Sequence, residues 1–245
     1  MSIRAFAIAL AAVLSAGCAS PTTESPSRAA ERYAAVIASS VRTDQDRRMD
    51  ATRDPAGFLP FTQVAPGMRV LDVSTGGGYT SQLLALAVGP EGRVFAQAPT
   101  PGAAVTARLR ERPQANFILV ARPFEDPVPP EAPPLDLVTI VLNYHDISYL
   151  PVDRAKMNAR LFAALRPGGR LVVIDHAARA GTGAADGRTL HRIDEMLVRQ
   201  ELTQAGFVLD ADGAFLRNPV DPRDRTSNDS PFPTDKFALR FVKPR

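Results

Sequence analysis

Two groups of residues in this chain have types and spacings that could support chemistry. The first is the run from Asp72 to Gly78, in which an acid is followed by Val, Ser, Thr and three glycines. Glycines permit positive φ and close approach of a ligand, and a helix that starts behind them presents free N–H groups. The second group is the three histidines, His145, His176 and His191, two of which stand beside an acid. The first group predicts a binding turn, and the second predicts a place where protons can be exchanged.

The residues around the glycine run predict how it is positioned. An apolar strand precedes it at 70–73, and an amphipathic helix follows at 80–88. The same composition also suits a plain strand–turn–helix corner, so this pattern alone leaves a purely structural role open.

Strands and helices alternate along the rest of the chain. We expect further strands at 93–97, 117–121, 135–142, 170–175, 207–209 and 237–242, and helices at 29–40, 103–111, 152–165 and 188–205. The proline-rich residues 126–134 and the polar residues 218–235 are expected to be loops. This alternation predicts an α/β fold, Rossmann-like and doubly wound, with a mostly parallel seven-stranded sheet and an antiparallel last strand.

Two of these motifs resemble those of the class I S-adenosylmethionine-dependent methyltransferases: "VLDVSTGGGY" at 70–79 and "RPGG" at 166–169. The resemblance extends over about residues 60 to 245. More narrowly, the chain is similar to a bacterial family of exported methyltransferases. That similarity is carried by "LNYHD" at 142–146, "VIDHAA" at 173–178, "LHRID" at 190–194 and "TDKFALRFVKP" at 234–244. The resemblance implies S-adenosyl-L-methionine as the cofactor and methyl transfer as the activity.

The resemblance also implies where the cofactor binds. Asp72, Ser74, Gly76, Gly78 and Tyr79 match the donor motif, except that Ser74 stands where the family has its first glycine. A serine fits there if its φ is negative, although it narrows the approach to the ligand.

Further cofactor contacts are expected from three other loops. Gln97 ends the second strand, where the family commonly has an acid that binds both ribose hydroxyls, so we expect weaker ribose binding. Phe124 and Asp126 match the place that holds the adenine, although both could instead be solvent-facing loop residues. Asn143, after the fourth strand, could line the donor methyl.

The catalytic groups are expected in the same loop as Asn143. His145 has the ordinary pKa of a general base, and we expect it to act as base or acceptor-orienting group, helped by Asp146 or by His176. Tyr144 could line the donor methyl or simply pack in the core. The same edge could admit a divalent metal, but spacing alone does not establish one, and none is predicted.

The chain's length and charge limit the remaining interpretations. Its 245 residues suit a helical cap at 29–58 and a methyltransferase-like domain at 59–245. The charged residues 42–54 form either part of this cap or a solvated helix face. A net charge of +3, with basic residues spread along the chain, gives no reason to expect a nucleic-acid partner. The expected partner is a small-molecule acceptor, and the oligomeric state is left open.

The first 18 residues have the pattern of an export signal. Arg4 precedes an apolar stretch at 5–14, which is too short to span a membrane, and the stretch ends in a lipobox-like sequence before Cys18. Cys18 is the only cysteine, which favours lipidation there over an ordinary signal peptide with an incidental cysteine. Residues 19–28 are then a flexible tether, and the protein is expected as a lipoprotein at the periplasmic face of a bacterial membrane.

Two alternatives to a methyltransferase stay open at this point. The first is a non-catalytic module that binds a small ligand or nucleoside on the same fold, which the changes at Ser74 and Gln97 favour. The second is an NAD-dependent dehydrogenase, which is weaker because "STGGGY" lacks the dinucleotide spacing.

Overall fold

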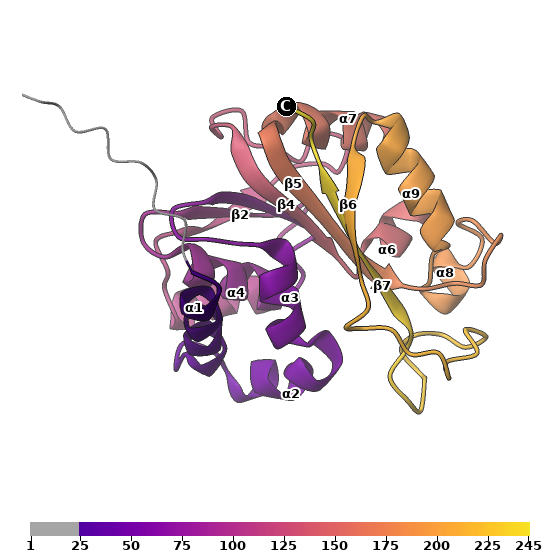
Figure 1. Ribbon diagram of the computed structural model, residues 1–245, viewed down its shortest axis with the longest axis horizontal. Helices are drawn as coiled ribbons and strands as arrows, with labels where there is room; N and C mark the ends of the chain where they lie inside the picture. Colours follow the sequence, from indigo (N-terminus) through magenta and orange to yellow (C-terminus); the bar gives the residue numbers. More distant parts are fainter. Residues whose placement is uncertain (1–24) are drawn as a thin grey trace, which may run out of the picture.

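The computed structural model describes residues 25–245, which form one seven-stranded sheet in the order β3-β2-β1-β4-β5-β7-β6 (Figure 1). Strand β7 runs antiparallel to both of its neighbours, and the other strand pairs are parallel. The predicted sheet, with its antiparallel last strand, is therefore confirmed. The strands are β1 (Arg69–Val73), β2 (Arg93–Ala98), β3 (Phe117–Ala121), β4 (Leu135–Val141), β5 (Leu165–His176), β6 (Val208–Gly213) and β7 (Lys236–Val242).

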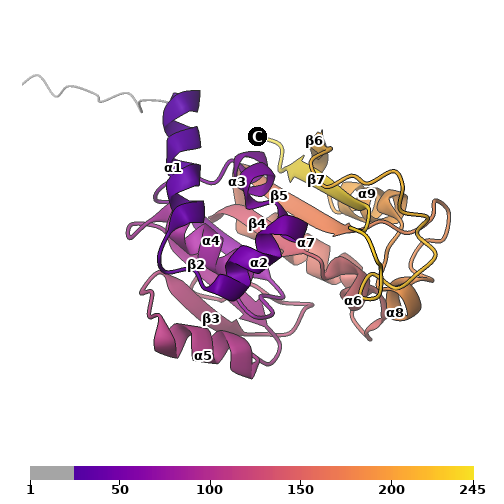
Figure 2. The ribbon, with the colours of Figure 1, turned by 90° about the horizontal axis from the view of Figure 1, so that it is seen from below.

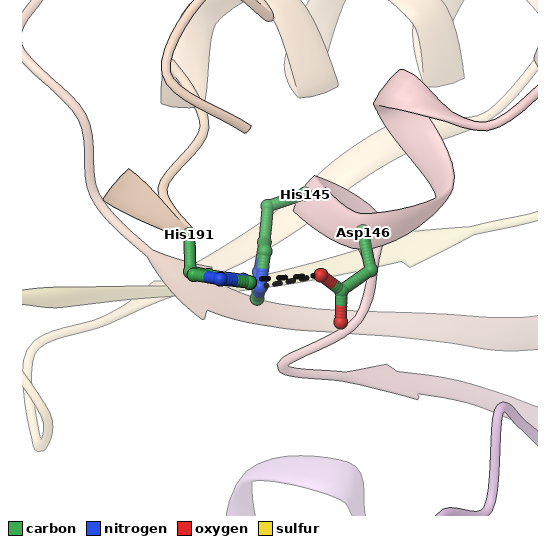
Figure 3. Close-up of side chains that lie close together, drawn as sticks. All are labelled: His145, Asp146 and His191. Carbon is green, nitrogen blue, oxygen red and sulfur yellow. Dashed lines mark hydrogen bonds and ion pairs between the residues drawn. The ribbon is translucent and has the colours of Figure 1, made fainter. Parts of the chain in front are cut away.

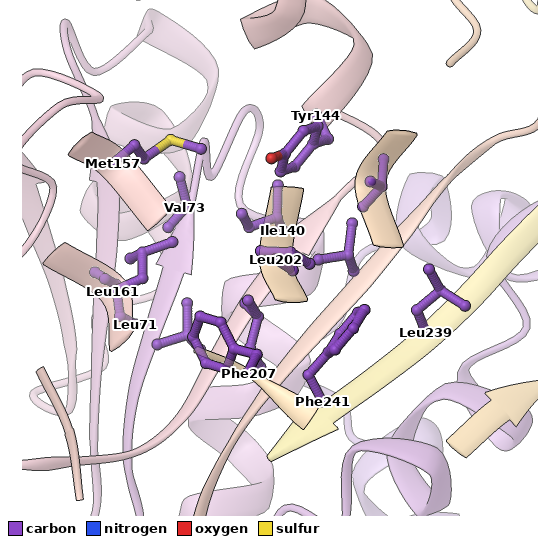
Figure 4. Packing of buried hydrophobic residues seen from close by; sticks show 14 of the residues in the cluster. Leu71, Val73, Ile140, Tyr144, Met157, Leu161, Leu202, Phe207, Leu239 and Phe241 are labelled. Carbon is purple, nitrogen blue, oxygen red and sulfur yellow. The ribbon is translucent and has the colours of Figure 1, made fainter. Parts of the chain in front are cut away.

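Helices cover both faces of the sheet, which makes its central strands apolar on both sides. Val70 and Leu71 are neighbours in β1 that point to opposite faces, and both are fully buried. One face carries α1 (Pro26–Ala38), α3 (Pro55–Thr62), α4 (Tyr79–Val88) and α5 (Ala103–Glu111). The other face carries α7 (Arg154–Ala164) and α9 (Glu195–Gln204), whose residues pack with those of β4, β5 and β7 (Figure 4).

The N-terminal helices share the core of the sheet. Tyr33 and Val36 of α1 and Leu59 of α3 are buried in the cluster that also contains residues of β1 and α4. The expected boundary at residue 58 therefore falls inside α3. Helix α2 (Asp44–Arg53) connects α1 and α3 (Figure 2). It begins with a capping box between Thr43 and Asp46.

Two segments differ from the sequence-based expectation. The "NYHD" residues do not form a loop, because α6 (Tyr144–Tyr149) begins directly after Asn143. The helix expected over 188–205 is broken into α8 (Gly187–Leu190) and α9, since His191 adopts φ 50° and ends the first piece. Helices α6 and α8 are only six and four residues long, which is too short for a helical periodicity to be recognised in the sequence.

Arg192 and Asp194 of the "LHRID" motif stabilise the loop between α8 and α9. The fully buried Arg192 pairs with Asp221 (2.8 Å) and donates to the carbonyl of Ala177, while Asp194 caps α9. These residues therefore fix the loop that presents His191.

The predicted signal peptide and Cys18 lie outside the described residues, as does most of the predicted tether. Among residues 25–245, no helix is both long and apolar enough to cross a membrane.

Candidate active site

The candidate site lies at the point where the strand order reverses. β1 and β4 are adjacent central strands, and the chain leaves them toward opposite sides of the sheet, so their C-terminal loops open a crevice. The two loops are joined by a hydrogen bond of 2.7 Å from Ser74 Oγ to Asn143 Oδ1. Both predicted residues therefore lie at the same place, one from each wall of the crevice.

The glycine turn presents open backbone to this crevice. Gly76 has φ 52°, and a Cβ placed on it would meet no atom within 4 Å. Gly78 has φ 84° and is packed differently, because a Cβ there would come within 3.1 Å of Val105. Gly76 thus leaves room for a ligand, whereas Gly78 allows the helix to pack.

The expectation for the φ of Ser74 is wrong. Its φ is 61°, in the left-handed region that glycine occupies without strain, and it stands where the resembling family has a glycine. The serine keeps the glycine-like backbone, and its hydroxyl is used to hold Asn143.

Asp72 is a buried acid at the wall of the same cavity. Its carboxylate accepts hydrogen bonds from Thr139 (2.7 Å) and Ser81 (2.5 Å). Burial raises the pKa of Asp72 to about 6, although both hydrogen bonds and the charge of Arg53 lower it. Two acceptor positions on the carboxylate are satisfied by the protein, and the remaining lone pairs can accept from a ligand.

Helix α2 forms the outer wall of this cavity, as a cap would. Asp46 is buried and pairs with Arg108 of α5 (2.7 Å), and Tyr79 donates to Asp50 (2.7 Å). Arg108 also donates to the carbonyl of Gly77 (2.8 Å), so the cap, α5 and the glycine turn are connected. The cavity between them measures about 440 Å³, and the predicted site residues that line it are Asp72, Ser74, Gly76, Tyr79 and Asn143.

Gln97 does not face this cavity, which corrects its expected contact with a ribose. The side chain is fully buried; its Oε1 accepts from the Ser74 backbone N–H (3.0 Å), and its Nε2 donates to the Arg122 carbonyl (2.6 Å). Side chains alternate along a strand, so the next position, Ala98, points the other way and carries no polar group. The second strand therefore offers no carboxylate to a ribose.

Phe124 and Asp126 also lie away from the cavity. Phe124 packs against the core on the side of α7, and Asp126 pairs with Arg122 and with Arg160 (2.8 Å). Their expected contacts with an adenine are therefore not part of the observed arrangement.

Tyr144 points into the core rather than toward the crevice (Figure 4). Its ring is fully buried, its hydroxyl donates to Glu201 (2.7 Å), and that hydroxyl accepts from Asn158 (2.8 Å). The expected place beside a donor methyl is thus wrong, because the first turn of α6 directs residue 144 to the opposite side from Asn143.

His145 is held between two acids. Its Nδ1 lies 2.6 Å from Asp175 Oδ1, and its Nε2 lies 3.3 Å from Asp146 Oδ1. Burial alone would lower the pKa of His145, but the charges of Asp175 and Asp146 outweigh it and raise the pKa to about 9. The two carboxylates therefore favour the charged form of the imidazole, and the role of His145 as a general base stays a prediction.

His176 lines a second cavity, of about 450 Å³, together with Arg53 and Lys236. Its Nδ1 lies 2.8 Å from the Thr234 hydroxyl. Burial, followed by the charge of Lys236, lowers the pKa of His176 to about 2, so the ring is neutral. Sequence reasoning missed Arg53 and Lys236; Lys236 belongs to the quoted "TDKFALRFVKP" motif, but neither residue has a local signal for a role at the site.

The strand order, the antiparallel β7 and the glycine turn at the switch point define the fold of the class I S-adenosylmethionine-dependent methyltransferases. A methyltransferase of this kind from Aquifex aeolicus is 19% identical, with a TM-score of 0.58 over 82% of this chain and 100% of its own. The N-methyltransferase NodS from Bradyrhizobium japonicum is 15% identical, with a TM-score of 0.55 over 82% of this chain and 98% of its own.

An O-methyltransferase from Thermotoga maritima is also similar, with 18% identity and a TM-score of 0.52 over 79% of this chain and 65% of its own. Residues 29–138 match the family model of the protein-L-isoaspartate(D-aspartate) O-methyltransferases. No curated protein sequence matches the chain. The similar structures include both N- and O-methyltransferases, so the fold does not identify the acceptor.

Proposed function

We propose that this protein transfers the methyl group of S-adenosylmethionine to a small anionic acceptor. The observation that carries the proposal is the position of Arg53, which lines both the cavity at the glycine turn and the cavity at His176. A donor in the first cavity and an acceptor in the second would therefore meet at one side chain.

The residues of the first cavity fit this cofactor. Gly76 leaves open space beside the backbone, Asp72 can accept from the ammonium group of the methionine part, and Arg53 can pair with its carboxylate. Bound there, the cofactor supplies an electrophilic methyl group on a sulfonium. The chain's own contribution is mainly to hold donor and acceptor in line.

The second cavity is suited to an anion. Arg53 and Lys236 both line it, and none of its lining residues is an acid. Within residues 25–245, the Arg53 guanidinium forms no ion pair and lies over the Tyr79 ring, whose centroid is 5.8 Å away. Burial and the charge of Arg53 lower the pKa of Lys236. The partly buried Arg53 and the buried Lys236 repel each other, and an anion bound between them would offset that repulsion.

An anionic acceptor would also need no general base. A carboxylate, phenolate or thiolate attacks a sulfonium methyl group without first losing a proton at the site. Arg53 and Lys236 would favour the ionised form of such an acceptor, so neither His145 nor His176 needs to accept a proton.

Isothermal calorimetry of the purified protein with S-adenosylmethionine and S-adenosylhomocysteine tests the donor half of the proposal. Gly76→Val should weaken binding roughly tenfold or more, because its side chain enters the open space beside the turn. Gly89→Val is a matched control, since Gly89 has φ 65° and equally open surroundings at the far end of α4. Equal binding by both variants would remove the glycine turn from the site.

One observation favours a second candidate, a non-catalytic module that binds another small ligand. Gln97 is used inside the protein and Ala98 offers no acceptor, so a ribose loses a contact on this strand. If neither S-adenosylmethionine nor S-adenosylhomocysteine binds wild type, this second candidate replaces the first.

We also propose export with lipidation at Cys18, supported by the apolar stretch at 5–14 and by the single cysteine of the chain. Intact-mass measurement of the membrane fraction tests this. A full-length chain without a lipid, found in the cytosol, would contradict it.

A further inference from the structure

His145, Asp146 and His191 converge from α6 and from the end of α8 (Figure 3). Asp146 Oδ1 lies 3.3 Å from His145 Nε2 and 3.3 Å from His191 Nδ1. We propose that these three side chains bind a divalent transition-metal ion, with Zn²⁺ as its representative. This inference stands apart from the proposed methyl transfer, because it concerns metal binding by the protein alone.

The spacing of the three groups suits such an ion. Zinc bonds to imidazole nitrogen and carboxylate oxygen are about 2.0–2.2 Å long, which puts neighbouring ligand atoms roughly 3.0–3.5 Å apart. The two measured separations lie in this range, and the three ligand atoms all fall within 4.8 Å of one another. Both carboxylate–imidazole separations therefore already suit an ion, and the two imidazole nitrogens lie no more than 4.8 Å apart.

Asp175, which lies behind His145, fixes the orientation of the His145 ring. Asp175 is fully buried and takes up Nδ1 of His145 at 2.6 Å, which leaves Nε2 for the metal. The same carboxylate accepts from the backbone N–H groups of His145 and His176, both at 2.8 Å. A carboxylate behind a histidine in this way is the usual support of a metal ligand.

The other two ligands are also held in place. Tyr149 donates to Asp146 at 3.0 Å, and His191 is presented by a backbone with φ 50°. A left-handed histidine is strained, and its position is fixed by the buried Arg192 beside it. The broken helix thus turns His191 toward His145, with the two rings at 90° and their centroids 5.6 Å apart.

The cluster has a closed side and an open side. His145 is 5% exposed at its side chain, whereas Asp146 and His191 are 35% and 33% exposed. Ions and additional ligands can reach the open side. The centroid of the His145 ring lies 5.8 Å from that of His176, which lines the second cavity. A bound ion would therefore add positive charge beside that cavity.

The ligand types select the kind of ion. Two imidazoles and one carboxylate suit Zn²⁺ and other late first-row ions, whereas Mg²⁺ and Ca²⁺ prefer sites made of oxygen atoms. We therefore expect binding of Zn²⁺ and Co²⁺, and none of Mg²⁺ at comparable concentration.

Calorimetry of the metal-stripped full chain with ZnCl₂ tests this, with no methyl donor present. One ion per chain is expected. His191→Ala should weaken binding at least tenfold, and Asp175→Asn should weaken it roughly 10- to 100-fold as an outer-shell change. His176→Ala is the control, because His176 belongs to the same edge but not to the ligand set.

Circular dichroism and the absorption spectrum of the Co²⁺ form provide the second readout, since a folded His191→Ala variant should lose the cobalt bands of wild type. Failure of wild type to bind Zn²⁺ would overturn the inference, as would equal binding by His191→Ala. Neither result bears on binding of the methyl donor, which is measured separately.

Discussion

Ser74 and Asn143 are 69 residues apart in the chain and are joined by a hydrogen bond of 2.7 Å across the crevice. Ser74 directly follows β1, at the start of the glycine turn. Asn143 lies between β4 and α6. The same Asn143 side chain donates to the Val141 carbonyl at 3.0 Å. This contact fixes the separation of the two loops that form the donor cavity.

Two small substitutions at Ser74 should differ in their effect on stability. Both Ser74→Ala and Ser74→Gly lose the hydrogen bond to Asn143. Alanine keeps a Cβ at a left-handed backbone position, whereas glycine removes that Cβ and with it the backbone strain. We expect Ser74→Gly to be more stable than Ser74→Ala by about 1 kcal/mol. Urea unfolding of both variants measures the difference. Equal stabilities would mean that φ 61° carries no strain here.

Asp72 should make the protein less stable as pH rises. Its pKa is raised in the folded state, from 3.8 to about 6, so the folded protein resists ionisation that the unfolded chain undergoes freely. Between pH 4 and 7, wild type should lose about 2 kcal/mol relative to Asp72→Asn, which has no charge to bury. Urea unfolding at both pH values gives this difference. A difference that is constant with pH would contradict it.

The Asp46–Arg108 ion pair should stabilise the packing of α2 against α5. Its charges are mostly buried, with side chains 2% and 13% exposed, so a double-mutant cycle with Asp46→Asn and Arg108→Met should give a coupling of about 1–3 kcal/mol. The exposed Arg110–Glu111 pair is the control and should give about 0–1 kcal/mol.

The coupling between Asp46 and Arg108 should also depend on pH in a definite direction. Burial raises the pKa of Asp46, but hydrogen bonds from Arg108 and Thr43 outweigh burial and lower it to about 2. The stabilisation is therefore complete above about pH 4 and is lost as pH falls toward 2. A coupling that grows on acidification would show that another group is responsible.

Arg53 and Lys236 should make the protein bind simple anions. Sodium benzoate should raise the melting temperature of wild type above its value in sodium chloride at equal ionic strength, because the carboxylate binds the folded state. Arg53→Gln should abolish this gain, and Lys236→Met should abolish it without affecting S-adenosylmethionine binding, since Lys236 does not line the donor cavity.

Arg48→Gln is the matched control for the anion measurement, because Arg48 lies on the same helix as Arg53 but is exposed and lines neither cavity. A gain from benzoate that survives Arg53→Gln and Lys236→Met would place the anion elsewhere on the surface.

The alternation of elements, the sheet type and the glycine turn can be predicted from the order of the residues. These features depend on residues that are close together in the chain, such as the apolar run at 70–73 and the positive φ that Gly76 and Gly78 allow. Asp72, Gly76 and Asn143 lie at the cavity because strand ends meet at one edge of a parallel sheet, which topology alone dictates.

The directions of the strand-end side chains, and the partners that they contact, are properties of the folded molecule. Gln97 and Ala98 are consecutive, and one step along a strand reverses the side, so the sequence could not tell which of them faces a ligand. Tyr144 and His145 depend in the same way on the first turn of α6. The contact of His145 with Asp175 and the shared cavity of Arg53 and Lys236 join residues that are far apart in sequence. Such encounters depend on how the layers pack, and no local pattern encodes them.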